Sequence, residues 1–150
     1  MNSFKLGLYT LGAYVVMSIA SWAIADGLPD IYISTVFIII SVLSFVMWHE
    51  AIRKGMSKSI KDGVIVSMFF IVPYGLIVLT TYRAFFRDEL RDVYKLLIWT
   101  IFNNPMRIVH YEISQLKSIG FYVFEPFLIM GILLLVNITI HLFRSKNKNV

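Results

Sequence analysis

The chain has 150 residues, of which 58% are hydrophobic, and its mean hydropathy is +0.74. This composition lies outside the range of soluble globular domains and indicates a membrane protein. The sequence contains no cysteine, which excludes disulfide scaffolds, thiolate metal sites and thiol catalysis. The formal net charge is +5, but in a membrane protein the placement of lysine and arginine reports topology first. We therefore expect the lipid bilayer, and no nucleic acid, as a partner.

The first two apolar segments predict a membrane-spanning hairpin. Residues 6–25 are uncharged, and a helix needs about 20 such residues to cross the hydrocarbon core. Residues 26–30 contain a glycine and a proline, which favour a turn. Residues 31–48 are also uncharged, and in lipid even this β-branched stretch must be helical to satisfy its backbone. As an alternative, Lys5 and the A-x-A pattern at Ala23-Ile24-Ala25 are typical of a secretory signal.

Two further spans follow a basic connection. Residues 49–62 predict a short loop, and residues 63–82 form the third uncharged segment. Pro73 lies near the middle of that segment and predicts a kink, because proline removes a backbone donor. The fourth span is expected over residues 126–143, with Pro126 in its first helical turn.

Together these segments predict an all-α integral membrane protein, a four-transmembrane-helix bundle forming a single domain of residues 1–150. The short connection at 49–62 and both termini are basic, so the positive-inside rule predicts that both termini are cytoplasmic. Small size and the lack of cysteine favour a bacterial cytoplasmic membrane. Lys146 and Lys148 also match a dilysine retrieval pattern of eukaryotic membrane proteins, which leaves that alternative open.

Residues 83–119 form the one long stretch that is not simply hydrophobic. At 100° per residue its first half has an apolar stripe opposite a charged face, and Asn104-Pro105 ends one helix and starts another. We therefore expect an amphipathic helical hairpin between spans three and four, lying on the outer leaflet. It either caps the bundle or docks a partner. The candidate partner-binding residues are Phe86, Arg87, Leu90, Arg91, Leu97 and His110.

Polar residues at matching depths in the spans predict an intramembrane polar layer. Its members are Thr10, Ser41, Ser44, Ser67 and Asn137. Hydrogen bonds between helices in such a layer contribute about 0.6 to 2 kcal/mol each, so the layer favours a structural role over an ion or substrate site. At the outer face we expect an ion pair between Arg83 and Glu125. The histidines show no metal-ligand spacing, so we expect neither a metal nor a cofactor.

The sequence contains no phosphate-binding loop, nucleophile elbow or metal-binding carboxylate repeat, which disfavours an enzyme. The favoured function is that of a small, non-enzymatic membrane protein that binds a membrane-associated partner, as an accessory subunit or as an immunity-type protein against a pore-forming toxin. The alternative is a homo-oligomeric channel, holin or small transporter. A third possibility is a lipid-modifying membrane enzyme that uses the basic flank of the insert.

Overall fold

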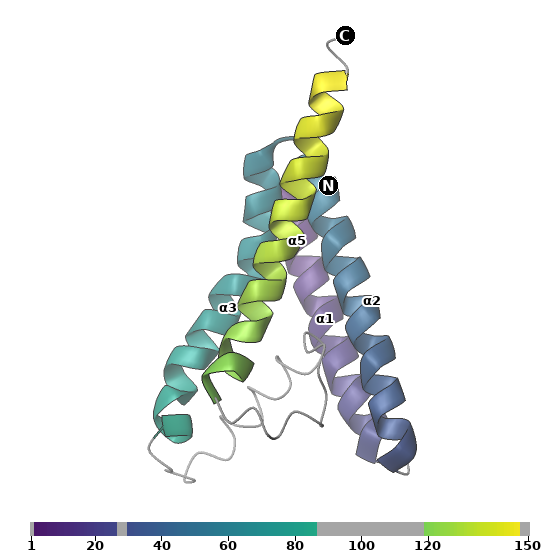
Figure 1. Ribbon diagram of the computed structural model, residues 1–150, viewed down its shortest axis with the longest axis vertical. Helices are drawn as coiled ribbons and strands as arrows, with labels where there is room; N and C mark the ends of the chain where they lie inside the picture. The colour runs from purple at the N-terminus through teal and green to yellow at the C-terminus, as the bar shows by residue number, and fades with distance from the viewer. Residues whose placement is uncertain (1, 27–29, 87–118, 148–150) are drawn as a thin grey trace.

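Four α-helices make up the part of the chain that the computed structural model describes, residues 2–26, 30–86 and 119–147. They are α1 (Ser3–Asp26), α2 (Asp30–Met56), α3 (Ile60–Phe86) and α5 (Ile119–Asn147), as Figure 1 shows. Three stretches are long and apolar enough to cross a membrane: Ser3–Ser21, Ile60–Leu79 and Glu125–Ser145. The predicted all-α class is confirmed for the described residues, and these stretches coincide with three of the four predicted spans.

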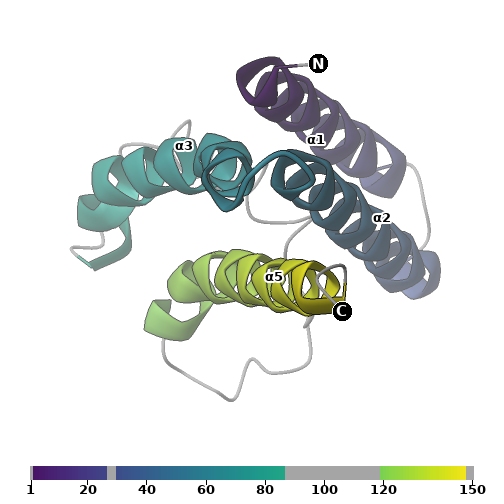
Figure 2. The ribbon, with the colours of Figure 1, turned by 90° about the horizontal axis from the view of Figure 1, so that it is seen from above.

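The four helices converge at one end and separate at the other. The converged end carries the start of α1, the turn between α2 and α3, and the last turns of α5 (Figure 1). Toward the opposite end, α1 and α2 run together and diverge from α3 and α5. Seen from above, the end of α2 and the start of α3 meet at the centre and the two helices then run to opposite sides, with α1 beside α2 and α5 on the side away from α1 (Figure 2). The converged end is therefore where the four described helices come together.

The connection predicted over residues 49–62 is much shorter in the structure. Helix α2 continues to Met56 and α3 begins at Ile60, so the loop prediction was wrong for most of its length. The side chain of Ser59 explains the early start of α3, because its Oγ accepts a hydrogen bond from the backbone N–H of Asp62 at 3.1 Å. Ser59 also donates to the Asp62 carboxylate at 2.7 Å, which completes a helix-capping arrangement.

Two other predicted boundaries are corrected at the opposite end. Helix α5 begins at Ile119, so Pro126 lies inside the helix and not in its first turn. Helix α3 contains Pro73 and continues to Phe86, so the first residues of the predicted insert belong to the third helix. Both prolines lie within long apolar helices. The rest of the predicted amphipathic hairpin lies outside the described residues.

Aromatic side chains fill the centre of the bundle and join all four helices. Tyr14 of α1, Trp48 of α2 and Phe70 of α3 contact one another edge to face, with ring centroids 5.4 to 6.2 Å apart. Phe70 stacks on Tyr74 at 5.5 Å, and Tyr74 meets Phe127 of α5 at 4.8 Å. Tyr14, Trp48, Phe70 and Tyr74 are completely buried. We call these five residues the aromatic ladder.

Glycines allow the helices to approach closely near the converged end. A Cβ atom on Gly7 of α1 would overlap Phe69 of α3, and one on Gly63 would overlap Met56. On Gly55 a Cβ would lie 3.0 Å from the carbonyl oxygen of Asp62 and 3.1 Å from the Cα of Gly63. In lipid, where apolar surface gains little from burial, such close van der Waals packing is a main source of helix association.

The outward faces of the helices carry large apolar side chains. Exposed examples from the four helices are Leu8, Val16, Ile38, Val42, Leu79 and Leu135. A soluble protein rarely exposes so extensive an apolar surface. This pattern, with serines and aromatic hydroxyls inside, matches a bundle whose surroundings are hydrocarbon.

We predict that Gly55→Leu destabilises the bundle by roughly 1–3 kcal/mol, because the new side chain meets backbone atoms of α3 that cannot move aside. Gly12→Leu is the matched control, since a Cβ there has no neighbour within 4 Å. The control should leave stability unchanged or slightly raised through helix propensity. The free energy of unfolding in detergent, followed by circular dichroism, measures both. Equal losses in the two variants would contradict the packing described for Gly55.

Candidate functional site

A hydrogen bond between side chains joins α2 to α5 near the converged end. Asn137 is buried, and its amide nitrogen lies 3.0 Å from Nδ1 of His49. The same nitrogen donates to the backbone carbonyl of Leu133 at 2.8 Å. These contacts fix the orientation of the amide, because a flipped Asn137 would place its oxygen against the Leu133 carbonyl. His49 Nδ1 therefore accepts the hydrogen bond, and a neutral His49 carries its proton on Nε2.

The second polar atom of Asn137 is a buried acceptor. Its Oδ1 receives no hydrogen bond from the described part of the chain. Burying an acceptor without a donor costs about 1–3 kcal/mol. Asn137 also lines a pocket between α2 and α5.

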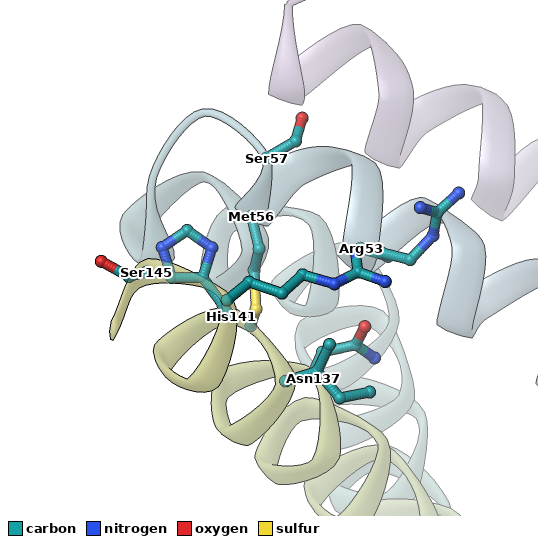
Figure 3. A pocket seen from close by; sticks show the side chains of 8 residues that line it. Arg53, Met56, Ser57, Asn137, His141 and Ser145 are labelled. Carbon is teal, nitrogen blue, oxygen red and sulfur yellow. The ribbon is translucent and has the colours of Figure 1, made fainter. Parts of the chain in front are cut away.

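This pocket lies where the last turns of α2 and α5 meet, and its volume is about 350 Å³. Figure 3 shows the residues from α2 and from α5 whose side chains surround it. They are Arg53 and Met56 of α2, Ser57 of the turn that follows α2, and Asn137, Ile140, His141, Arg144 and Ser145 of α5. Two arginines, a histidine and two serines thus line one small space, with apolar walls from Met56 and Ile140.

Arg53 is partly engaged by an acidic neighbour on its own helix. Its Nη2 lies 2.6 Å from Oε2 of Glu50, and its Nε donates to both carboxylate oxygens at 3.0 and 3.2 Å. The hydrogen bond from Arg53 lowers the pKa of Glu50 below its ordinary value, and the same contact raises the pKa of Arg53. Both side chains are more than two-fifths exposed, so this pair contributes little to stability.

A second carboxylate at the converged end binds α1 to the start of α3. Asp62 accepts hydrogen bonds from the hydroxyls of Ser3 and Ser59. Ser3 is buried, so this contact fixes the first turn of α1 against the α2–α3 turn. No motif in the sequence links Ser3 to Asp62, so this hydrogen bond is seen only in the structure.

The residues predicted to form an intramembrane polar layer are all buried, and the layer itself stays a prediction. Thr10, Ser44 and Ser67 each donate to a carbonyl of their own helix, at 2.8 Å. Asn137 instead reaches another helix through His49, which was not among the predicted site residues. A comparison of depths that included histidine would have paired them, because both lie near the same end of their helices.

Most of the other predicted site residues lie outside the described residues. Glu125 is buried within the bundle, but the side chain of Arg83 is not described, so their ion pair remains a prediction. The side chain of Phe86 is likewise not described, so its role in partner binding remains a prediction. The remaining candidate partner-binding residues, Arg87, Leu90, Arg91, Leu97 and His110, lie outside the described residues. Within the described ranges, no three histidine or carboxylate side chains gather in a way that would hold a metal ion.

Comparisons with known proteins give no family to which the chain belongs: no family model, curated protein or solved structure matches it significantly.

We predict that Asn137→Ala lowers the free energy of unfolding by roughly 0.6 to 2 kcal/mol, because it removes the link between α2 and α5. Thr139→Ala is the matched control on the same helix, since Thr139 is exposed and its hydroxyl bonds only to Leu135 of α5. A double-mutant cycle that combines Asn137→Ala with His49→Ala measures the coupling energy between the two side chains. No coupling between positions 49 and 137, or an equal loss in Thr139→Ala, would contradict this assignment.

Proposed function

We propose that this protein is a four-span integral membrane protein that acts by binding a membrane-associated partner, and that it carries no conduction path through its own bundle. The aromatic ladder carries this proposal, because it occupies the interior where a path between the helices would run. With the interior filled, the surfaces left for function are the outward faces and the helix ends. An accessory subunit and an immunity-type protein both act through such surfaces.

The placement of charge supports a bundle with both termini in the cytoplasm. Most cations of the described residues gather at the converged end, which holds Lys5, Arg53, Lys54, Lys58, Lys61 and Arg144. Clustering of lysine and arginine on one side of the apolar segments is typical of the cytoplasmic side. Helix α2 then forms the fourth span, because it is 27 residues long and packs along α1 and α3. The membrane is proposed to be the bacterial cytoplasmic membrane.

A homo-oligomeric channel, holin or small transporter is the second candidate. It would need a path between copies of the chain, since the ladder closes the interior of one copy. Among the described residues, Ser21, Ser44 and Ser67 are buried and donate to carbonyls of their own helices, which favours a structural role for them over the lining of a path. Partner binding through the 83–119 segment therefore remains the better proposal.

We predict that the apolar stripe of this segment is needed for partner capture. In cells, a photo-crosslinking amino acid at position 93 should give a discrete crosslinked product. The triple variant Phe86→Ala, Leu90→Ala, Leu97→Ala should reduce that product about tenfold or more, because each truncation removes buried apolar contact. The variant Asp88→Ala, Asp92→Ala, Lys95→Ala changes the opposite side of the predicted helix and serves as the control.

Insertion into the membrane is measured in parallel by carbonate extraction. Failure of the triple alanine variant to insert would mean that the segment is only a structural cap. Proton or potassium flux through vesicles that contain the purified protein, together with a symmetric homo-oligomer in mild detergent, would favour the channel and overturn partner binding.

A further inference from the structure

We propose that the pocket between the last turns of α2 and α5 binds a phosphate-bearing anion, and that this anion is the headgroup of an anionic phospholipid. The phosphate chemistry follows from the side chains that line the pocket. The lipid source rests on the proposed membrane insertion of the bundle.

The converged end carries an excess of positive charge. Among the described residues, its carboxylates are Glu50 and Asp62, and both already accept hydrogen bonds from neighbouring side chains. Five lysines and arginines other than Arg53 lie at the same end, so the local field favours an anion. A phosphate group placed there meets cations without approaching a free carboxylate of the described residues.

Donors for a phosphate come from both helices. Arg144 and His141 line the pocket from α5, and Arg53 lines it from α2. Arg53 uses Nε and Nη2 to hold Glu50, which leaves Nη1 for a second acceptor. The planar guanidinium presents paired N–H groups that match the spacing of phosphate oxygens, which makes arginine a preferred phosphate ligand.

The apolar part of the pocket favours a lipid over free phosphate. Met56 of α2 and Ile140 of α5 contribute apolar lining, and Val136, one turn before Ile140 on the same face of α5, is exposed. The apolar stretch of α5 ends at Ser145, so the pocket lies at the level where hydrocarbon gives way to headgroups. A phospholipid bound here would place its phosphate near Arg144 and its acyl chains along the exposed apolar face. Free phosphate makes no use of such a wall.

The test measures retention of radiolabelled phosphatidylglycerol by the immobilised full-length protein in mild detergent. About 0.5 M salt reduces the screening length to roughly 4 Å, so diffuse attraction to surface lysines contributes little. The variant Arg53→Gln, Arg144→Gln should bind roughly 25-fold more weakly, at about fivefold for each cation near the lipid surface. Glu50→Gln should bind more tightly, because it releases Arg53.

Lys5→Gln with Lys61→Gln removes two charges from the same end without touching the pocket, and this variant should bind as the unmodified chain does. Inorganic phosphate is tested in a second arm. If inorganic phosphate binds but phosphatidylglycerol does not, and the arginine variant loses this binding, the pocket is an anion site for a soluble ligand and the lipid assignment is wrong. Equal weakening by the lysine variant, or no weakening by the arginine variant while circular dichroism shows intact helices, would overturn the proposal.

This outcome is separable from the proposed function. Partner capture through the 83–119 segment is read out by crosslinking, and membrane insertion by carbonate extraction. A protein that inserts and captures its partner but retains no phosphatidylglycerol would refute the lipid site alone.

Discussion

The aromatic ladder is the contact on which the other features of the bundle depend. In the bilayer setting that we propose, the burial of apolar side chains does little to hold helices together, so shape and polar contacts matter most. Tyr14, Trp48 and Phe70 bring three helices to one point, and Tyr74 and Phe127 add the fourth. Edge-to-face contacts between aromatic rings have a preferred geometry, so they favour a single packing arrangement of the side chains inside the bundle.

The same contacts place polar chemistry at one end of the molecule. Glycines at the α2–α3 turn and the Ser3–Asp62 hydrogen bond bring the helix ends together there. The last turn of α2 places Arg53, and the turn that follows it places Ser57, beside α5. Asn137 and His141 of α5 line the same pocket. A pocket between two helix ends is therefore a consequence of this convergence, and Arg53 and Arg144 give it its basic character.

The sequence predicted the helical class because charge-free runs of about 20 residues have one solution in lipid. It did not predict where helices end, since Ser59 caps α3 inside a polar stretch that resembles a loop and Pro126 resembles a first-turn residue. Depth comparison found Asn137 as a buried polar residue. Its partner His49 lies 88 residues away and matches no motif, so the pairing follows from the depth of both residues in the bundle and not from a local pattern. The pocket was likewise hidden, because its arginines were counted only as signals of topology.

The most direct test of the central claim is the sidedness of single cysteines in this cysteine-free chain. The variants Gly27→Cys, Ser57→Cys and Asn103→Cys bracket α2 and α3. With four spans and cytoplasmic termini, positions 27 and 103 should react with a membrane-impermeant maleimide in intact cells, and position 57 only after permeabilisation. The reverse labelling pattern would agree with four spans but would contradict the proposed cytoplasmic location of the termini. Reaction of positions 27 and 57 from the same side would contradict the account, because α2 would then not cross the membrane.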